Sequence, residues 1–99
     1  MERYPIQIVQ IQLRVMESFP VQGMADVRGI IPDACSSVRE PEVTRSDYTF
    51  TIKIIGERPR DRACAQVIRE YQRNIPLGAL QPGDYVLHVN DVTTRFHID

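Results

Sequence analysis

Three stretches of the chain alternate apolar and polar residues with a period of two, the pattern of β-strands that bury one face. They cover residues 9–15, 21–27 and 50–54, and Ser18-Phe19-Pro20 separates the first from the second. Ile6 and Ile8 fall on the opposite phase from Val9. A change of phase inside a strand predicts a bulge or a strand crossing near Ile8–Val9.

The C-terminal residues predict a β-hairpin with a single register. A two-residue turn at Asn90-Asp91 pairs residue 89 with 92, 87 with 94 and 85 with 96, so that the inward positions of both strands coincide. The same register sets Asp84 opposite His97 as a cross-strand charge pair. No glycine follows Asn90, and we therefore expect Asp91 to adopt a positive φ.

The remaining segments are less regular. Residues 36–47 and 56–62 are polar and predict loops. Residues 61–75 match both helical and strand spacing; we expect a strand or an irregular segment, with one short helical turn near 63–71 as the open alternative. Short strands with turn residues about every 8–12 positions predict an all-β, antiparallel, immunoglobulin-like β-sandwich of about seven strands, formed by residues 1–99 as a single domain.

A tyrosine follows a Pro-Gly corner at the start of the penultimate predicted strand. Gly83 and Tyr85 resemble the tyrosine corner of immunoglobulin-like domains, in which the hydroxyl bonds to the upstream backbone. The alternative is that Tyr85 is a core aromatic residue with no special role. Both interpretations place its ring in the sandwich core.

Composition excludes several classes of function. The chain is 42% hydrophobic and 25% charged, with a net charge of −1, which is typical of a soluble globular domain. Basic and acidic residues are interleaved, so no basic stripe exists that could neutralise a nucleic-acid backbone. No stretch approaches the ~20 apolar residues of a membrane span.

Cys35 and Cys64 are the only cysteines. Two cysteines in a short β-rich chain fit an oxidising compartment, and a bridge between them would stabilise the fold by roughly 3.5 kcal/mol. The alternative is a pair of buried free thiols in a cytosolic protein. The first interpretation places the protein outside the cytoplasm, either secreted or lipid-anchored to the cell envelope.

No motif for a metal, a cofactor or catalysis is present. A metal site would need the cysteines to converge with His88 and His97, which the hairpin register holds roughly 13 Å apart. Ser36 and Ser37 have no context that would activate a nucleophile. We therefore expect no metal, no cofactor and no enzymatic activity.

The two polar loops supply the candidate partner-binding residues. These are Arg39, Glu40, Arg45, Arg58, Arg60 and Arg62. Arginines of this kind can bind partner carboxylates through two parallel hydrogen bonds. The alternative is a solvated loop whose own acids, Glu57 and Asp61, pair with the arginines.

Several short blocks occur in a specific order along the chain. They are residues 17–22 (ESFPVQ), 28–35 (RGIIPDAC), 50–52 (FTI), 58–59 (RP), 63–66 (ACAQ), 75–77 (IPL), Leu80, 82–85 (PGDY) and 89–90 (VN). Their order resembles an uncharacterised family of bacterial and archaeal secreted lipoprotein domains. The resemblance implies an exported cell-envelope domain with an immunoglobulin-like sandwich and a Cys35–Cys64 bridge. Gly23 stands where that pattern has an aliphatic residue, which predicts a weaker contribution to the core there.

The sequence thus favours a non-enzymatic extracytoplasmic module, either a protein-interaction domain or a spacer of a cell-envelope lipoprotein. We expect a monomer whose partner is a protein or another cell-surface component. The first alternative is an inhibitor of secreted proteases that presents an exposed loop. The second is a polysaccharide-binding module, although the chain has no tryptophan and most of its tyrosines and phenylalanines fall at inward positions.

Overall fold

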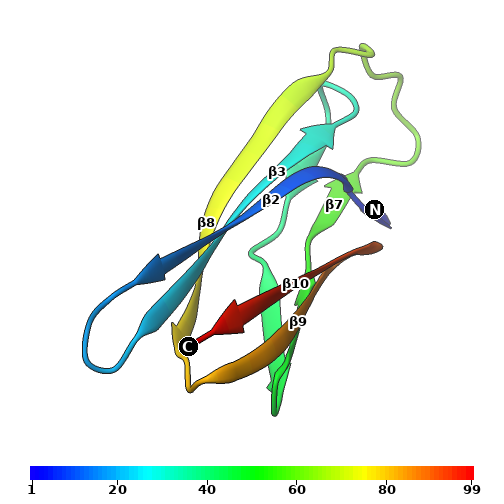
Figure 1. Cartoon of the computed structure of the whole chain (residues 1–99). Coiled ribbons are helices and arrows are strands. Elements are labelled where there is room, and N and C mark those ends of the chain that lie inside the picture. The colour runs from blue at the N-terminus through cyan, green and yellow to red at the C-terminus, as the bar shows by residue number, and fades with distance from the viewer.

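Ten β-strands and no helix make up the structure, a computed structural model that describes residues 1–99 (Figure 1). The strands are β1 (Glu2–Pro5), β2 (Gln7–Met16), β3 (Gln22–Ile31), β4 (Ser37–Val38), β5 (Glu42–Ser46), β6 (Thr49–Lys53), β7 (Ile55–Arg58), β8 (Arg69–Ala79), β9 (Gly83–Val89) and β10 (Val92–Ile98). The predicted all-β class is confirmed. The number of strands is higher than the seven expected for two reasons. Two long strands are each divided by a break, and residues 36–47 contain two short strands.

The strands form three sheets, in the orders β2-β3-β8, β10-β9-β6-β5 and β1-β7-β4. One chain segment runs from β1 into β2 and another from β6 into β7, with breaks at Ile6 and Ile54. Both isoleucines are buried, so each break lies in the core. The β6–β9 pairing is parallel, which departs from the expectation of purely antiparallel sheets.

The irregularity predicted near Ile8–Val9 is confirmed. The register between β2 and β3 shifts between Ile8 and Gln10, and Val9 is left out of the pairing. Gly29 lies opposite Ile8, and a Cβ there would come within 2.6 Å of the Gln7 carbonyl oxygen. The close approach of the two backbones at this bulge therefore requires glycine.

The β9–β10 hairpin has the predicted register, with Val89 opposite Val92 and Asp84 opposite His97. The prediction of a positive φ at Asp91 was wrong, because Asn90 carries it, with φ of 53°. The physical reason is the Asn90 side chain, which folds back to bond the backbone at the breaks between β1 and β2 and between β6 and β7. Asparagine tolerates this left-handed conformation better than most residues.

Gly23 itself adds no side chain to the core, and a residue from another segment fills the space beside it. A Cβ at Gly23 would lie 2.5 Å from Leu80 Cδ1, so the glycine makes room for the Leu80 side chain. Leu80 is only 4% exposed and belongs to the continuous core of sixteen buried residues. The core therefore receives its apolar group here from another segment of the chain.

Two predicted loops contain strands, whereas residues 61–75 are an irregular segment followed by a strand, as expected. Residues 36–47 contain β4 and β5, and residues 55–58 form β7, where loops were predicted. Every residue of β5 is exposed, so its sequence carries no alternation that could reveal a strand. The helical turn near 63–71 is absent: residues 62–68 are irregular and β8 begins at Arg69.

Candidate functional site

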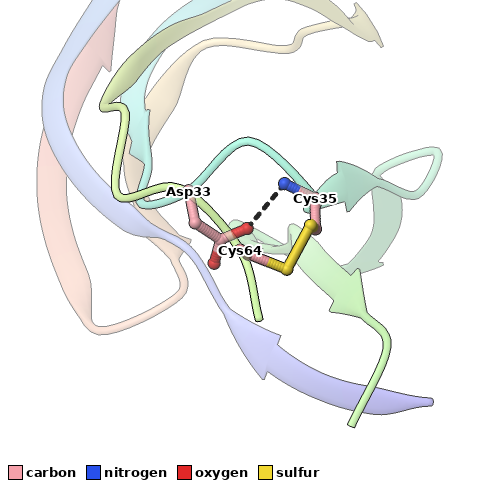
Figure 2. Close-up of side chains that lie close together, drawn as sticks. All are labelled: Asp33, Cys35 and Cys64. Carbon is pink, nitrogen blue, oxygen red and sulfur yellow. Dashed lines mark hydrogen bonds between the residues drawn. A yellow bond between two sulfur atoms is a disulfide. The ribbon is translucent and has the colours of Figure 1, made fainter. Parts of the chain in front are cut away.

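A disulfide joins Cys35 to Cys64 and confirms the predicted bridge (Figure 2). Cys35 lies in the turn after β3, and Cys64 lies in the irregular segment 59–68 between β7 and β8. Beside the bridge, the Ala34 N–H donates to the Ala65 carbonyl oxygen at 3.0 Å. The bridge therefore attaches a segment that has no strand pairing of its own to the end of β3.

Asp33 organises the turn that carries Cys35. Its Oδ1 accepts hydrogen bonds from the Cys35 N–H (3.0 Å), the Ser36 N–H (2.8 Å) and the Ser36 hydroxyl (2.9 Å). Its Oδ2 accepts one from Arg58 at 3.0 Å. Burial opposes ionisation, but these hydrogen bonds, first among them that of Arg58, outweigh it and hold the pKa of Asp33 below its usual value. The buried carboxylate is therefore charged and satisfied at neutral pH.

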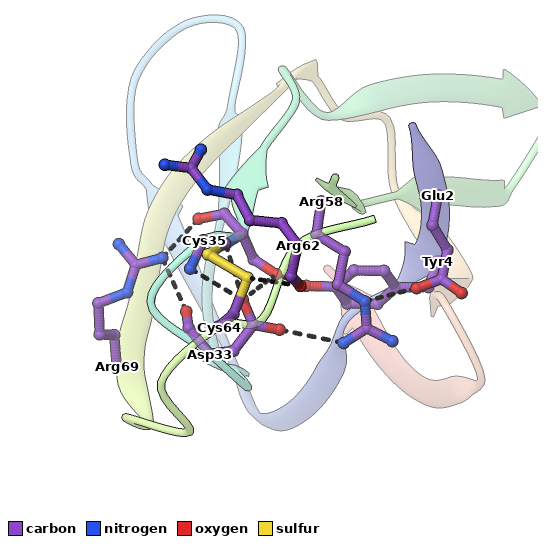
Figure 3. A network of polar contacts seen from close by, with 9 residues as sticks. Glu2, Tyr4, Asp33, Cys35, Arg58, Arg62, Cys64 and Arg69 are labelled. Atoms are coloured by element: carbon purple, nitrogen blue, oxygen red, sulfur yellow. Dashed lines mark hydrogen bonds and ion pairs between the residues drawn. A yellow bond between two sulfur atoms is a disulfide. The ribbon is translucent and has the colours of Figure 1, made fainter. Parts of the chain in front are cut away.

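Two arginines hold this turn from either side (Figure 3). Arg58 pairs with Asp33 at 3.0 Å and with Glu2 of β1 at 2.5 Å. Its guanidinium also lies 4.9 Å from the centroid of the Tyr4 ring. The Tyr4 hydroxyl in turn donates to the Ser36 hydroxyl. Arg69 donates to the carbonyl oxygens of the same turn. The network connects β1, the disulfide turn and the start of β8, and its geometry is that of a structural clamp.

Asp33, Cys35 and Cys64 form one group whose potential ligand atoms lie within 4.8 Å of one another. Metal binding by cysteine needs a thiolate, and both sulfurs are committed to the disulfide. All the oxygens of Asp33 already accept hydrogen bonds, one of them from a guanidinium. The donor set of the oxidised protein therefore does not fit a metal ion.

Most of the predicted partner-binding residues are engaged within the chain. Arg39 pairs with Glu57 at 2.6 Å, Glu40 with Arg73 at 2.5 Å, and Arg45 and Arg58 bond neighbouring strands and turns. Arg39 and then Arg3 lower the pKa of Glu57, with burial opposing them. Arg60 and Arg62 make no ion pair and lie exposed in segment 59–68. The structure does not bring the six residues together into one site.

The corner at Gly83 and Tyr85 arranges a cluster of aromatic rings. The Tyr85 hydroxyl donates to the Gln81 carbonyl oxygen at 2.7 Å, which is the bond expected of a tyrosine corner. Gly83 has a φ of 150°, and a Cβ there would lie 2.7 Å from the Tyr48 ring. The glycine therefore lets Tyr48 pack against the corner, with its ring centroid 5.0 Å from that of Tyr85.

The hairpin between β2 and β3 carries the most exposed aromatic residue. Figure 1 shows its loop projecting from one end of the molecule, at the lower left. Phe19 lies in this loop with its side chain fully exposed, and Val15 and Met16 beside it are about half exposed. In the sequence, residues 18–20 indicate only a strand break. The signal for an exposed site there is an aromatic residue between turn residues, where no strand face can bury it.

These features define a small disulfide-bridged β-sandwich domain. Residues 25–98 match the family described as the ORF11 beta-sandwich domain, and the chain belongs to this family. No helix of the structure has the length and apolar composition needed to cross a bilayer. No solved structure matches the chain.

Relatives from Herpetosiphon aurantiacus resemble three quarters or more of the chain. One, named as an uncharacterized 10.2 kDa protein in the HgiCIIM 5′ region, is 32% identical over 88% of this chain and 94% of its own length. Two others, named for the HgiBIM and HgiEIM 5′ regions, are each 36% identical over 76% of this chain and 93% of their own length. These names give the relatives no activity, so the comparisons support the β-sandwich and leave its function to be proposed.

Proposed function

We propose that the protein is a non-enzymatic interaction module that acts outside the cytoplasm, secreted or held at the cell envelope, and binds a protein partner through residues 17–21. The observation that carries this proposal is the fully exposed Phe19 at the tip of a projecting hairpin. Aromatic residues are enriched at the centres of protein interfaces, where a projecting ring can fill a pocket of the partner. The partner is therefore a protein with an apolar pocket that accepts one phenyl ring.

Hydrogen bonds within the tip favour this role. The Ser18 N–H donates to the Met16 carbonyl oxygen at 2.9 Å, and the Ser18 hydroxyl donates to the Pro20 carbonyl oxygen at 2.7 Å. A loop that is ordered before binding loses less conformational entropy when it meets a partner.

The disulfide supports a location outside the cytoplasm. Structural disulfides persist in oxidising compartments and are rare in reducing ones. Cell fractionation tests this part: the protein should be found in the extracytoplasmic fraction with no titratable thiols. Recovery from the cytosol with two free thiols would contradict it.

The binding role is tested with a photo-crosslinking phenylalanine analogue at position 19. The captured envelope protein is purified, and its affinity is then measured for the wild type and for Phe19→Ser. Burial of a phenyl ring contributes about 1.5–3 kcal/mol, so the variant should bind roughly tenfold or more weakly. Val67→Ser is the matched control, because Val67 is an exposed apolar residue in segment 59–68, away from the hairpin tip. Equal binding by both variants, or no cross-link at position 19, refutes the proposal.

Inhibition of a secreted protease is a second candidate, favoured by the same observation. An ordered convex loop with one protruding aromatic side chain can enter the specificity pocket of a protease. Inhibition by the wild type of a secreted protease with an aromatic-accepting pocket, lost in Phe19→Ser, would support this form of the proposal. The absence of inhibition across such proteases leaves only non-inhibitory binding.

A further inference from the structure

A recess of about 600 Å³ opens beside the turn that joins β5 to β6. Its lining consists of Arg45, Asp47, Tyr48 and Gln81. The recess is an open surface depression, because all four of its lining residues are exposed. The four residues provide one aromatic ring, one cation, one carboxylate and one amide.

Tyr48 supplies a fixed ring that remains accessible. Its ring packs at 60° against Tyr85, and Gly83 lies close enough beneath it that a Cβ would clash. The residue is nevertheless 42% exposed. The ring is therefore held in place by the tyrosine corner while part of its surface stays open to a ligand.

Arg45 is fixed in the same recess. Its Nε donates to the Asp47 carbonyl oxygen and its Nη1 to the Ala79 carbonyl oxygen, each at 3.0 Å. Its guanidinium also lies 4.9 Å above the centroid of the Phe50 ring. These contacts leave Nη2 as a positioned donor, and they hold a side chain that would otherwise lose entropy on binding.

Asp47 and Gln81 complete the set of polar groups. Neither the Asp47 carboxylate nor the Gln81 amide bonds to another side chain, so the recess offers acceptors as well as donors. The charges of Arg45 and Asp47 cancel. The Asp47 carboxylate would repel an anionic ligand, and the Arg45 guanidinium would repel a cationic one. A ligand without charge therefore fits best.

We infer that this recess binds a neutral sugar ring. The C–H face of a pyranose can pack on the exposed part of Tyr48, and adjacent hydroxyls can accept from Arg45 while donating to Asp47. The Gln81 amide can do both. This inference goes beyond the proposed function, because it concerns a saccharide instead of a protein partner and uses none of the residues of the hairpin tip.

The test is an NMR titration of the full chain, with its disulfide intact, using cellobiose, chitobiose, maltose and lactose. A single site of this size is expected to bind with a Kd on the order of 1 mM. At least one disaccharide should produce saturable shifts confined to the amides of residues 45–48 and 81–83. Tyr48→Ala should abolish them, and Gln81→Ala, an exposed position, should weaken binding several-fold.

Two further variants make the outcome decisive. Phe19→Ser should bind the saccharide as the wild type does, so that a failure of the hairpin-tip proposal is distinguishable from a failure of this one. Gly83→Ala should weaken saccharide binding, since its methyl group displaces the Tyr48 ring. If Tyr48→Ala does not fold, Gln81→Ala decides. The absence of saturable shifts with all four sugars, shifts elsewhere, or unchanged affinity in a folded Tyr48→Ala or in Gln81→Ala overturns the inference.

Discussion

Asn90 connects three parts of the sandwich, and its removal gives the sharpest test of the fold. Its Oδ1 accepts from the Ile54 N–H at 2.9 Å, and its Nδ2 donates to the carbonyl oxygens of Ile6 at 2.8 Å and Ile54 at 3.1 Å. Both isoleucines are almost fully buried. The asparagine side chain thus satisfies backbone groups at the two points where strands break in the core.

The expected cost of Asn90→Ala follows from these contacts. Unpaired buried backbone groups cost about 1–3 kcal/mol, and alanine at a φ of 53° adds about 1 kcal/mol. The free energy of unfolding should therefore fall by about 2–4 kcal/mol, a large part of a typical total of roughly 5–15 kcal/mol. Asn90→Gly loses the same hydrogen bonds but not the backbone strain, and it should be about 1 kcal/mol more stable than Asn90→Ala.

Urea denaturation with a shared m-value measures these differences, and hydrogen exchange of the Ile54 amide locates them. Asp91→Ala is the matched control, because Asp91 is the exposed neighbour in the same turn, and it should change stability by less than about 0.5 kcal/mol. If Asn90→Ala costs no more than the control, or if the Ile54 amide stays protected in it, the reasoning is refuted.

Three other predictions follow from single contacts. The hydroxyl of Tyr71 is buried without a hydrogen-bond partner, and burial raises its pKa, so Tyr71→Phe should keep or raise the melting temperature. Tyr85→Phe loses a hydroxyl that is hydrogen-bonded, and it should lower the melting temperature. Calorimetry that gives the opposite order of melting temperatures contradicts this prediction. Reduction of the disulfide, whose cysteines are 29 positions apart, should remove about 3.5 kcal/mol and lower the melting temperature by about 15 °C or more. A loss of only a few degrees means that the bridge constrains little. The Asp84 carboxylate accepts a hydrogen bond from His97 Nδ1 and thereby raises the pKa of His97. The pair therefore stabilises the fold fully below about pH 6.5, and its contribution is lost as the pH rises through the raised pKa. NMR titration should show a lower pKa for His97 in Asp84→Asn, and an unchanged curve rejects the pairing.

The sequence allowed prediction of the parts of the fold where one face of a strand is buried. The β9–β10 register was predictable because inward positions and a two-residue turn agree on one pairing. Strand β5 was not predictable, since all its residues are exposed and alternation requires a buried face. The helical spacing of Val67 and Ile68 was misleading because both side chains are exposed and no helix face packs on the core.

The candidate sites were less predictable than the fold for a different reason. The arginines singled out from the sequence could have faced a partner, but Arg39 and Arg58 pair with the carboxylates of Glu57 on β7 and Glu2 on β1. Those contacts join residues far apart in the chain, such as Arg58 and Glu2, and no local pattern reveals them. Local sequence does reveal which residues can form ion pairs, but only the tertiary structure determines which of them are already paired.

Whether a group is already bonded within the chain decides where on the molecule a ligand can bind. The charged groups of the disulfide turn are bonded to one another, so a ligand there would have to break bonds that hold the fold. Phe19 and Tyr48 differ, because their side chains are exposed while neighbouring residues fix the loop of the first and the ring of the second. An exposed group on an ordered support can gain contacts with a partner at little cost in entropy. We therefore propose these two aromatic positions as the binding sites, and the clamp at the disulfide stabilises the framework that carries them.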